Sequence, residues 1–361
     1  MNDISEKISA IEEEIRKTPY HKGTEHHIGK LKARLAKLKE EQIEMVFKTR
    51  GGGGGGYAIK KTGDASVVLV GPPSVGKSTL LNQLTRAESK IGAYDFTTLK
   101  VIPGMLDYQG AKIQIFDVPG IIAGAAQGKG RGKEVLAVAR SADLIILMVD
   151  VKTINLIPQI EAELHNAGVR LNEKPPAVSI VKHSCGGLKI SATTSLQLSR
   201  ETIKTLAHEF GLINAEIVIK ENLSLDRLVD AFLGNRAYLP YLVVINKVDL
   251  GKPQLILSIT KKAEVIFVSS QKGENLDVLK RKIWENLNLI RVYLKEGDQV
   301  DETDPLIVKK DFCLEDILNI TAIHGKENFR SARIFGPGAK FPGQEVSFRF
   351  TPQDGTIVQF F

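Results

Sequence analysis

The fold of this chain is indicated most clearly by the segment Val67-Val68-Leu69-Val70-Gly71-Pro72-Pro73-Ser74-Val75-Gly76-Lys77-Ser78-Thr79-Leu80-Leu81. Its first four residues are apolar and predict a buried strand, and the apolar residues after Ser78 predict the start of a helix. Between them lies the pattern G-x-x-x-x-G-K-[ST], in the strand–loop–helix context that a phosphate-binding loop requires. We therefore predict such a loop in an α/β fold with a mostly parallel sheet and helices on both faces.

The residue types of this loop explain what it can bind. Gly71 and Gly76 let the backbone wrap closely around phosphates, and the loop N–H groups and the helix N-terminus supply positive potential. We expect Lys77 to reach the β- and γ-phosphates and the Ser78 hydroxyl to ligate Mg²⁺. The alternative is an ordinary glycine turn, which the rarity of the pattern disfavours.

Composition places the chain among soluble globular proteins. Its 361 residues, 43% hydrophobic and 25% charged, are enough for two or three domains. The apolar runs are too short to cross a bilayer and the N-terminus has no apolar signal core, so we expect no membrane association. Cys185 and Cys313 lack metal-ligand spacing, so reduced thiols and a cytoplasmic location are expected. The net charge of +7 favours an anionic partner such as RNA, although a lysine-rich surface explains it equally well.

Residues 1 to about 47 predict two amphipathic helices, because apolar residues recur there every three or four positions. Thr18-Pro19 and Gly23-Thr24 punctuate the gap between them, so an antiparallel hairpin is expected. Five basic residues decorate the second helix: Lys30, Lys32, Arg34, Lys37 and Lys39. We interpret this face as solvated, with an RNA- or protein-binding face as the alternative. The glycine run 51–56 is interpreted as a hinge.

Two further motifs resemble the switches of a nucleotide hydrolase. The strand 113–116 leads into Asp117-Val118-Pro119-Gly120, in which Asp117 is expected to hold Mg²⁺ and the Gly120 N–H to bond the γ-phosphate. Upstream, Phe96-Thr97-Thr98 offers a threonine for the metal shell. Ile121 follows Gly120, and an isoleucine cannot orient water by hydrogen bonding. The attacking water must therefore be positioned by something else, such as the basic, glycine-rich segment 124–133 or a partner.

The base-recognition motifs stand at the ends of the last apolar strands. The strand 242–245 leads into Asn246-Lys247-Val248-Asp249, where the Asp249 carboxylate would accept from the guanine N1–H and amine. Adenine offers neither donor, which disfavours an ATPase of the same fold. Asn246 is expected to brace the loops and the Lys247 stem to lie along the base. Ser269-Ser270-Gln271 is the expected last base-contact loop. The motifs described above, in this order along the chain, predict GTP as substrate and GDP as product.

The remaining segments predict two smaller domains. Residues 169–238 are interpreted as an inserted α+β module, with a helix over 199–210 capped by Ser199. From about residue 290, short strands at 290–294, 306–308, 345–350 and 356–361 surround a helix over 314–323 capped by Asp311. This pattern predicts a β-grasp domain.

The chain resembles the developmentally regulated GTP-binding protein family of the Obg group of translation-associated GTPases. The resemblance covers almost the whole length and is carried by the phosphate loop, N-K-V-D and the segments 26–35, 94–99 and 128–132. It implies a helical hairpin with its glycine linker over 1–56, a GTPase domain over 57–289 interrupted by an S5-like insertion at 169–238, and a TGS domain over 290–361. It also implies that Thr98 ligates Mg²⁺. Some such enzymes use K⁺ through an asparagine in the phosphate loop, at a position that is Ser74 here, so a K⁺ requirement stays open.

The resemblance implies a ribosome or ribosomal RNA as partner and a small regulatory binding protein, and no sequence-specific DNA recognition. With Lys77, Thr98 and Gly120 acting on the transferring phosphoryl group, we predict slow GTP hydrolysis that a partner accelerates. The rival function is a nucleotide-dependent RNA- or ribosome-binding scaffold with negligible hydrolysis.

Overall fold

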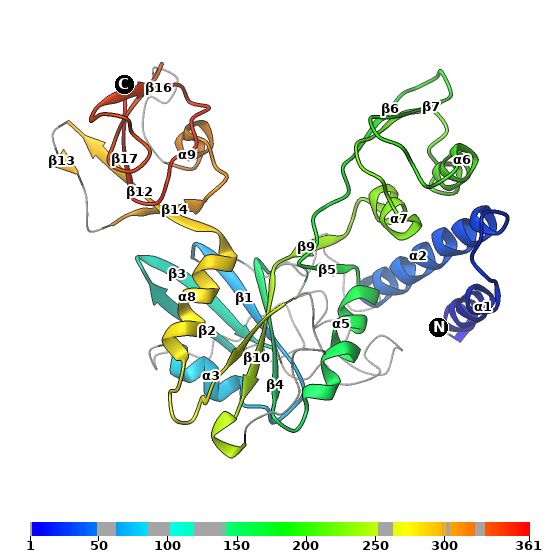
Figure 1. Ribbon diagram of the computed structural model, residues 1–361, viewed down its shortest axis with the longest axis horizontal. Coiled ribbons are helices and arrows are strands. Elements are labelled where there is room, and N and C mark those ends of the chain that lie inside the picture. The colour runs from blue at the N-terminus through cyan, green and yellow to red at the C-terminus, as the bar shows by residue number, and fades with distance from the viewer. Residues whose placement is uncertain are drawn as a thin grey trace. The chain divides into compact units, whose positions relative to one another are not determined.

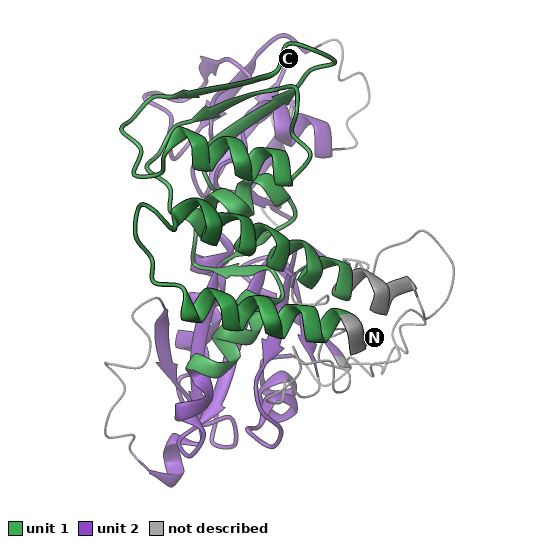
Figure 2. Ribbon diagram, turned by 90° about the vertical axis from the view of Figure 1, so that its right-hand side faces the viewer, with its two compact units in different colours: residues 1–58, 122–141, 158–239 green, residues 59–121, 142–157, 240–361 purple. Residues whose placement is uncertain are grey.

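The computed structural model describes residues 2–48, 63–85, 102–118, 140, 142–251, 263–297, 299–300, 304–321 and 329–361. The chain divides into two compact units, and Figure 2 shows the described residues of each in a separate colour. Unit 1 comprises residues 1–58, 122–141 and 158–239, and unit 2 comprises residues 59–121, 142–157 and 240–361. Among the described helices, none is long and apolar enough to span a membrane.

Unit 2 is built on a six-stranded sheet of order β11-β10-β4-β1-β3-β2. Its strands are β1 (Ala65–Val70), β2 (Ile102–Tyr108), β3 (Ala111–Asp117), β4 (Leu144–Asp150), β10 (Tyr241–Asn246) and β11 (Glu264–Phe267). All neighbours pair in parallel except β2, which pairs antiparallel with β3. Every residue of β1, β4 and β10 is buried, as expected for central strands of a parallel sheet.

Helices α3 (Lys77–Leu84) and α8 (Leu276–Leu287) cover one face of this sheet (Figure 1). Leu80 and Leu81 of α3 and Ile283 of α8 join Leu69 and Met148 in one buried core cluster. Because parallel strands end at the same edge, the loops after β1, β3, β4, β10 and β11 open on one side of the sheet. The predicted phosphate-loop α/β fold is confirmed, and this edge is where its motifs meet.

The C-terminal part of unit 2 is a second sheet with one helix. Its elements are β12 (Leu289–Glu296), β13 (Gln299–Val300), β14 (Leu306–Lys309), α9 (Leu314–Ile320), β15 (Ala332–Phe335), β16 (Gln344–Val346) and β17 (Thr356–Phe360). The strand order is β13-β12-β17-β15-β16, with β14 beside β12. Leu314 and Ile317 of α9 pack on Val292, Ala332 and Val358, so the helix covers one face as in a β-grasp.

Two local expectations for this part were wrong, and one strand is missing from the prediction. Cys313, not Asp311, is the N-cap of α9, because Cys313 and Asp316 form a reciprocal capping box. The strand predicted over 345–350 ends at Val346. The strand β15 was not predicted at all, since its four residues are too few to show a pattern; its pairing with β17 and β16 stabilises it.

Unit 1 combines the N-terminal helices with the inserted segment. Its elements are α1 (Asn2–Lys17), α2 (Glu25–Lys48), α5 (Ile157–Asn166), β5 (Val169–Leu171), β6 (Val178–Lys182), β7 (Leu188–Ala192), α6 (Arg200–Glu209), β8 (Ala215–Ile219), α7 (Leu225–Leu233) and β9 (Ala237–Leu239). The strands β6, β8 and β7 form one sheet. Ser199 caps α6 as predicted, accepting from the Thr202 N–H.

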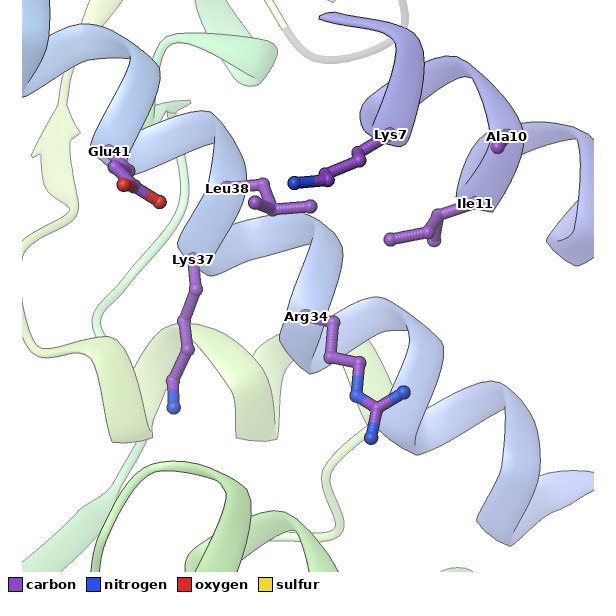
Figure 3. A pocket seen from close by; sticks show the side chains of 7 residues that line it. All are labelled: Lys7, Ala10, Ile11, Arg34, Lys37, Leu38 and Glu41. Atoms are coloured by element: carbon purple, nitrogen blue, oxygen red, sulfur yellow. The ribbon is translucent and has the colours of Figure 1, made fainter. Parts of the chain in front are cut away.

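The predicted antiparallel hairpin of α1 and α2 is confirmed. His27 bonds Glu14 at 3.0 Å and Gln42 donates to Ser5 at 3.0 Å, so residues late in one helix meet residues early in the other. An open hollow of about 480 Å³ lies between the two helices (Figure 3). Its lining is Lys7, Ala10, Ile11, Arg34, Lys37, Leu38 and Glu41.

The basic face of α2 is not simply solvated, which corrects the first interpretation. Lys32 pairs with Asp226 of α7 at 2.7 Å, and Lys30 and Arg34 lie 3.6 and 3.7 Å from the Glu209 carboxylate of α6. The Lys37 ammonium donates to the Glu209 carbonyl oxygen, and Lys39 pairs with Glu12. Beneath these contacts Ile28 and Ala33 of α2 share a buried core with Ile203 and Leu206 of α6. The charged and apolar contacts together attach α2 to the inserted segment.

A buried charge cluster lies where the insertion begins and ends. Asp230 of α7 accepts two hydrogen bonds from Arg170 of β5, at 2.6 and 2.7 Å, and one from Arg236 at 3.0 Å. Arg236 also donates to Glu40 of α2 at 3.3 Å. The side chains of Arg170, Asp230 and Arg236 are at most 8% exposed. Because β5 pairs with β9, these charges lie beside the ribbon that joins the insertion's two ends.

Replacing Asp230 by asparagine should destabilise the protein by about 3 kcal/mol, because two buried guanidinium groups would face a neutral amide. Urea unfolding followed by circular dichroism measures the change. Asp226→Asn is the matched control, because the Asp226 side chain is 63% exposed. Its pair with Lys32 should contribute less than about 1 kcal/mol. Equal losses for the two variants would contradict the importance assigned to the buried cluster.

Candidate nucleotide-binding site

The two glycines of the phosphate loop are required by their close neighbours. A Cβ on Gly71 would lie 2.0 Å from the Met148 carbonyl oxygen of β4. Gly76 has a φ of +96°, and a Cβ there would lie 2.5 Å from the Asn246 side-chain nitrogen. Gly76 therefore takes a left-handed conformation that favours glycine, immediately before α3 begins. The conformation of the loop is therefore constrained by its neighbours Met148 in β4 and Asn246 at the end of β10.

Lys77 is the first residue of α3 and folds back over the loop. Its side-chain nitrogen donates to the carbonyl oxygens of Gly71, at 3.1 Å, and Pro72, at 2.8 Å. The residue is 7% exposed. Burial lowers the pKa of Lys77, and the nearby Asp117 carboxylate partly opposes that shift. A buried cation at the mouth of the loop is well placed to attract an anionic ligand.

The oxygens of Ser78 and Asp117 form the candidate metal site. Ser78 Oγ donates to Asp117 Oδ2 at 2.5 Å. Asp117 is 5% exposed, and its Oδ1 is buried without a hydrogen-bond partner among the described residues. An orphaned carboxylate oxygen beside a hydroxyl fits a hard cation that prefers oxygen ligands, as Mg²⁺ does. The two sequence-predicted metal ligands that the structure describes are therefore brought together.

Asn246 connects three loops. Its Nδ2 donates to the Val75 carbonyl oxygen at 2.8 Å, and its Oδ1 accepts from the Ser270 N–H at 2.9 Å and the Ser270 hydroxyl at 3.0 Å. The residue is 2% exposed, and the three hydrogen bonds of its amide all reach loops at the same sheet edge. The loop after β1 and the loop after β11 are thus tied through the end of β10.

Asp249 lies in the short helix η3 (Val248–Leu250) and is half-buried. Its Oδ1 accepts from the Ser269 hydroxyl at 2.6 Å. That hydrogen bond, more than the nearby Lys272 charge, holds the pKa of Asp249 below its usual value. The carboxylate is therefore ionised and fixed in direction at neutral pH, as an acceptor for two N–H donors must be. Gln271 follows as an exposed residue of the same loop.

Lys247 makes contacts that the sequence did not predict. Its backbone is left-handed, with φ 61°. Its ammonium donates to the Ser74 carbonyl oxygen at 2.7 Å and to Asp150 Oδ2 at 2.9 Å. Asp150 ends β4 and is not among the site residues that the sequence predicts. An aspartate that closes a seven-residue apolar strand was the signal that would have found it.

Part of the predicted site lies outside the described residues. This holds for Phe96, Thr97, Thr98, Pro119 and Gly120, and also for Ile121 and the segment 124–133. The predicted site residues that the structure describes do converge. Each follows a strand that ends at the same edge of the sheet: 71–79, Asp117 with the buried Val118, 246–249 and 269–271. The arrangement offers a candidate phosphate-binding loop, a candidate divalent-cation site and an acidic side chain that is a candidate for base recognition.

Comparisons with known proteins agree with this arrangement. A family profile described as "50S ribosome-binding GTPase" matches residues 66–183, and one described as "C-terminal region of MMR_HSR1 domain" matches residues 185–289. A GTP-binding protein of Methanocaldococcus jannaschii is 48% identical over 98% of this chain and 92% of its own length.

Two eukaryotic relatives also match along nearly their whole length. The human developmentally-regulated GTP-binding protein 2 is 39% identical over 99% of this chain and 98% of its own. The ribosome-interacting GTPase 1 of Saccharomyces cerevisiae is 40% identical over 99% of both chains.

Proposed function

Because the chain belongs to the developmentally regulated GTP-binding protein family, we propose that it hydrolyses GTP to GDP and phosphate as a slow switch that a partner accelerates. The observation that supports this proposal most strongly is that the loop proposed to recognise guanine lies beside the phosphate loop. Asn246 and Lys247 reach consecutive carbonyl oxygens of that loop, those of Val75 and Ser74. The ends of one nucleotide would therefore be recognised by two physically connected loops.

In the proposed reaction a water attacks the γ-phosphate in line with the leaving GDP oxygen. Lys77 binds the β- and γ-phosphates, and the loop N–H groups hold them in place. Ser78 and Asp117, with Thr98 as a third ligand, would hold Mg²⁺, which neutralises phosphate charge. Gly120 would donate its N–H to the γ-phosphate. The rate acceleration over the uncatalysed reaction would come from positioning of the reactants and electrostatic stabilisation of the transition state rather than from a covalent step.

The proposed dependence on a partner follows from Ile121. A side chain without hydrogen-bonding atoms leaves the attacking water without an orienting group from that position. Donors from the segment 124–133, such as Gln127, Lys129 or Arg131, or from a partner, would supply it. A K⁺ requirement is a further open part of the proposal, because Ser74 stands at the position where some relatives use asparagine.

We also propose the domain limits that the sequence predicted: 1–56, 57–289 with the insertion 169–238, and a TGS domain over 290–361. A ribosome is the proposed partner, because one relative is named for interacting with it. A ribosomal partner would place the protein in the cytoplasm. A small regulatory binding protein remains a second proposed partner, on the resemblance alone.

Sedimentation with ribosomes tests the partner. We expect more of the protein to pellet with ribosomes when it is loaded with a non-hydrolysable GTP analogue than with GDP, because a switch must bind its partner differently in two states. Adding ribosomes should also raise the GTP cleavage rate. Equal sedimentation in both nucleotide states, with an unchanged cleavage rate, would contradict a ribosome-coupled switch. Nucleotide-dependent sedimentation with no cleavage would favour the scaffold instead.

A further inference from the structure

Asp150 is a buried carboxylate beside the nucleotide site that no predicted role uses. It ends β4, is 7% exposed, and pairs in register with Asn246 of β10. Burial by itself would raise the pKa of Asp150, but hydrogen bonds from Lys247 and Thr153 and the Lys247 charge outweigh it and hold the pKa below its usual value. The group is therefore an anion at neutral pH, and a buried anion requires specific partners.

The two oxygens of this carboxylate have separate partners. Oδ1 accepts from the Thr153 hydroxyl at 2.8 Å and from the Lys152 N–H at 3.1 Å, which closes the turn after β4. Oδ2 lies 2.9 Å from the Lys247 ammonium. One oxygen therefore serves the local fold, and the other serves a residue of the base-recognition loop.

Lys247 connects Asp150 to the phosphate loop. The same ammonium donates to the Ser74 carbonyl oxygen at 2.7 Å. Ser74 and Lys247 both have left-handed backbones, with φ of 62° and 61°. Such conformations are disfavoured in residues other than glycine and persist only when their surroundings hold them. The Asp150–Lys247–Ser74 chain joins the two strained residues directly.

The direction of the loop's N–H groups depends on these carbonyl contacts. In a planar trans peptide the C=O and the following N–H point to opposite sides. Lys247 holds the Ser74 carbonyl and Asn246 holds the Val75 carbonyl, both from the side of the base-recognition loop. The N–H groups of Val75 and Gly76 are thereby turned to the other side, as an anion-binding nest of N–H groups requires.

We propose that Asp150 is a positioning residue of the nucleotide site, which fixes the base-recognition loop to the phosphate loop by holding Lys247 on the Ser74 carbonyl. This inference rests on nucleotide binding at the site and not on hydrolysis. The role of Asp150 is indirect, since Asp150 acts through Lys247. Losing it should loosen both loops and so speed the release of GDP.

The test measures GDP affinity and release for Asp150→Asn and Thr153→Val in the full chain. Asparagine keeps an oxygen for the Thr153 and Lys152 donors but sets an NH₂ against the Lys247 ammonium. We expect its GDP dissociation constant to rise about tenfold, mainly through faster release. Thr153→Val removes the hydroxyl that bonds Oδ1 and the Asp150 backbone but leaves the contact between Oδ2 and Lys247, and should change GDP affinity by less than about twofold. Thermal unfolding without nucleotide establishes that both variants are folded.

A double variant separates positioning from a structural role. On a Lys247→Met background, Asp150→Asn should weaken GDP binding by less than about twofold further, because the residue it acts through is gone. Three results would overturn the inference: an unchanged dissociation constant in Asp150→Asn, equal losses in Asp150→Asn and Thr153→Val, or the full loss persisting on the Lys247→Met background. Failure of Asp150→Asn to fold while Thr153→Val folds would also assign Asp150 to structure alone. Absence of GDP binding by the unmodified chain would instead refute the proposed function.

Discussion

Replacing Asp249 by asparagine is expected to lower the affinity for GDP by about 100-fold and to move the preference towards xanthine nucleotides. The carboxylate accepts from two guanine donors, whereas an amide can accept from one and sets its NH₂ against the other. Xanthine carries an oxygen where guanine carries the amine, so the amide suits it better. Competition between GDP and xanthosine diphosphate on the same protein measures the change.

The control for this variant is Asp277→Asn. Asp277 is a fully exposed carboxylate in the first turn of α8, paired only loosely with Lys280 at 3.8 Å. The substitution removes the same charge from the same unit without touching the base loop. Its guanine preference should equal that of the unmodified protein. Unchanged guanine preference in Asp249→Asn would contradict the role assigned to Asp249.

Replacing Lys77 by methionine is expected to slow GTP cleavage by about 1000-fold, because one preorganised charge on the transferring phosphoryl group is lost. The buried ammonium donates to the Gly71 and Pro72 carbonyl oxygens, so the loop also loses these two internal hydrogen bonds. Initial rates at saturating GTP and Mg²⁺, together with GTP affinity, separate the loss in cleavage from the loss in binding.

Lys189→Met is the matched control for that variant, because Lys189 is an exposed lysine of β7 in the other unit. It should cleave GTP at the unmodified rate. A Lys77→Met variant that retained normal cleavage would place the reacting phosphates elsewhere in the protein.

The nucleotide fold could be predicted because its signals are local. The apolar run before Gly71, the loop pattern and the helix start all lie within fifteen residues, as do the strand and motif at Asn246. Each strand is buried along its whole length, so hydrophobicity alone marks it. The chemistry of each motif then followed from residue type.

The contacts that could not be predicted join residues far apart in the sequence. Lys32 and Asp226 are 194 positions apart, so nothing near Lys32 shows that its charge is paired. The role of Asp150 depends on β4 and β10 pairing in register, which brings Lys247 beside it. Cys313 replaces Asp311 as a helix cap because Asp316 completes the capping box, and side-chain preference alone favoured the aspartate.

Single-turnover cleavage of GTP, with Mg²⁺, by the unmodified chain and by Asp117→Ala tests whether the protein hydrolyses GTP at this site. Asp117 bonds Ser78 and carries the orphaned oxygen of the candidate metal site. We predict slow cleavage by the unmodified chain and at least about a hundredfold slower cleavage by the variant. Equal rates for the two proteins, or no cleavage by either with or without ribosomes, would contradict GTP hydrolysis at this site.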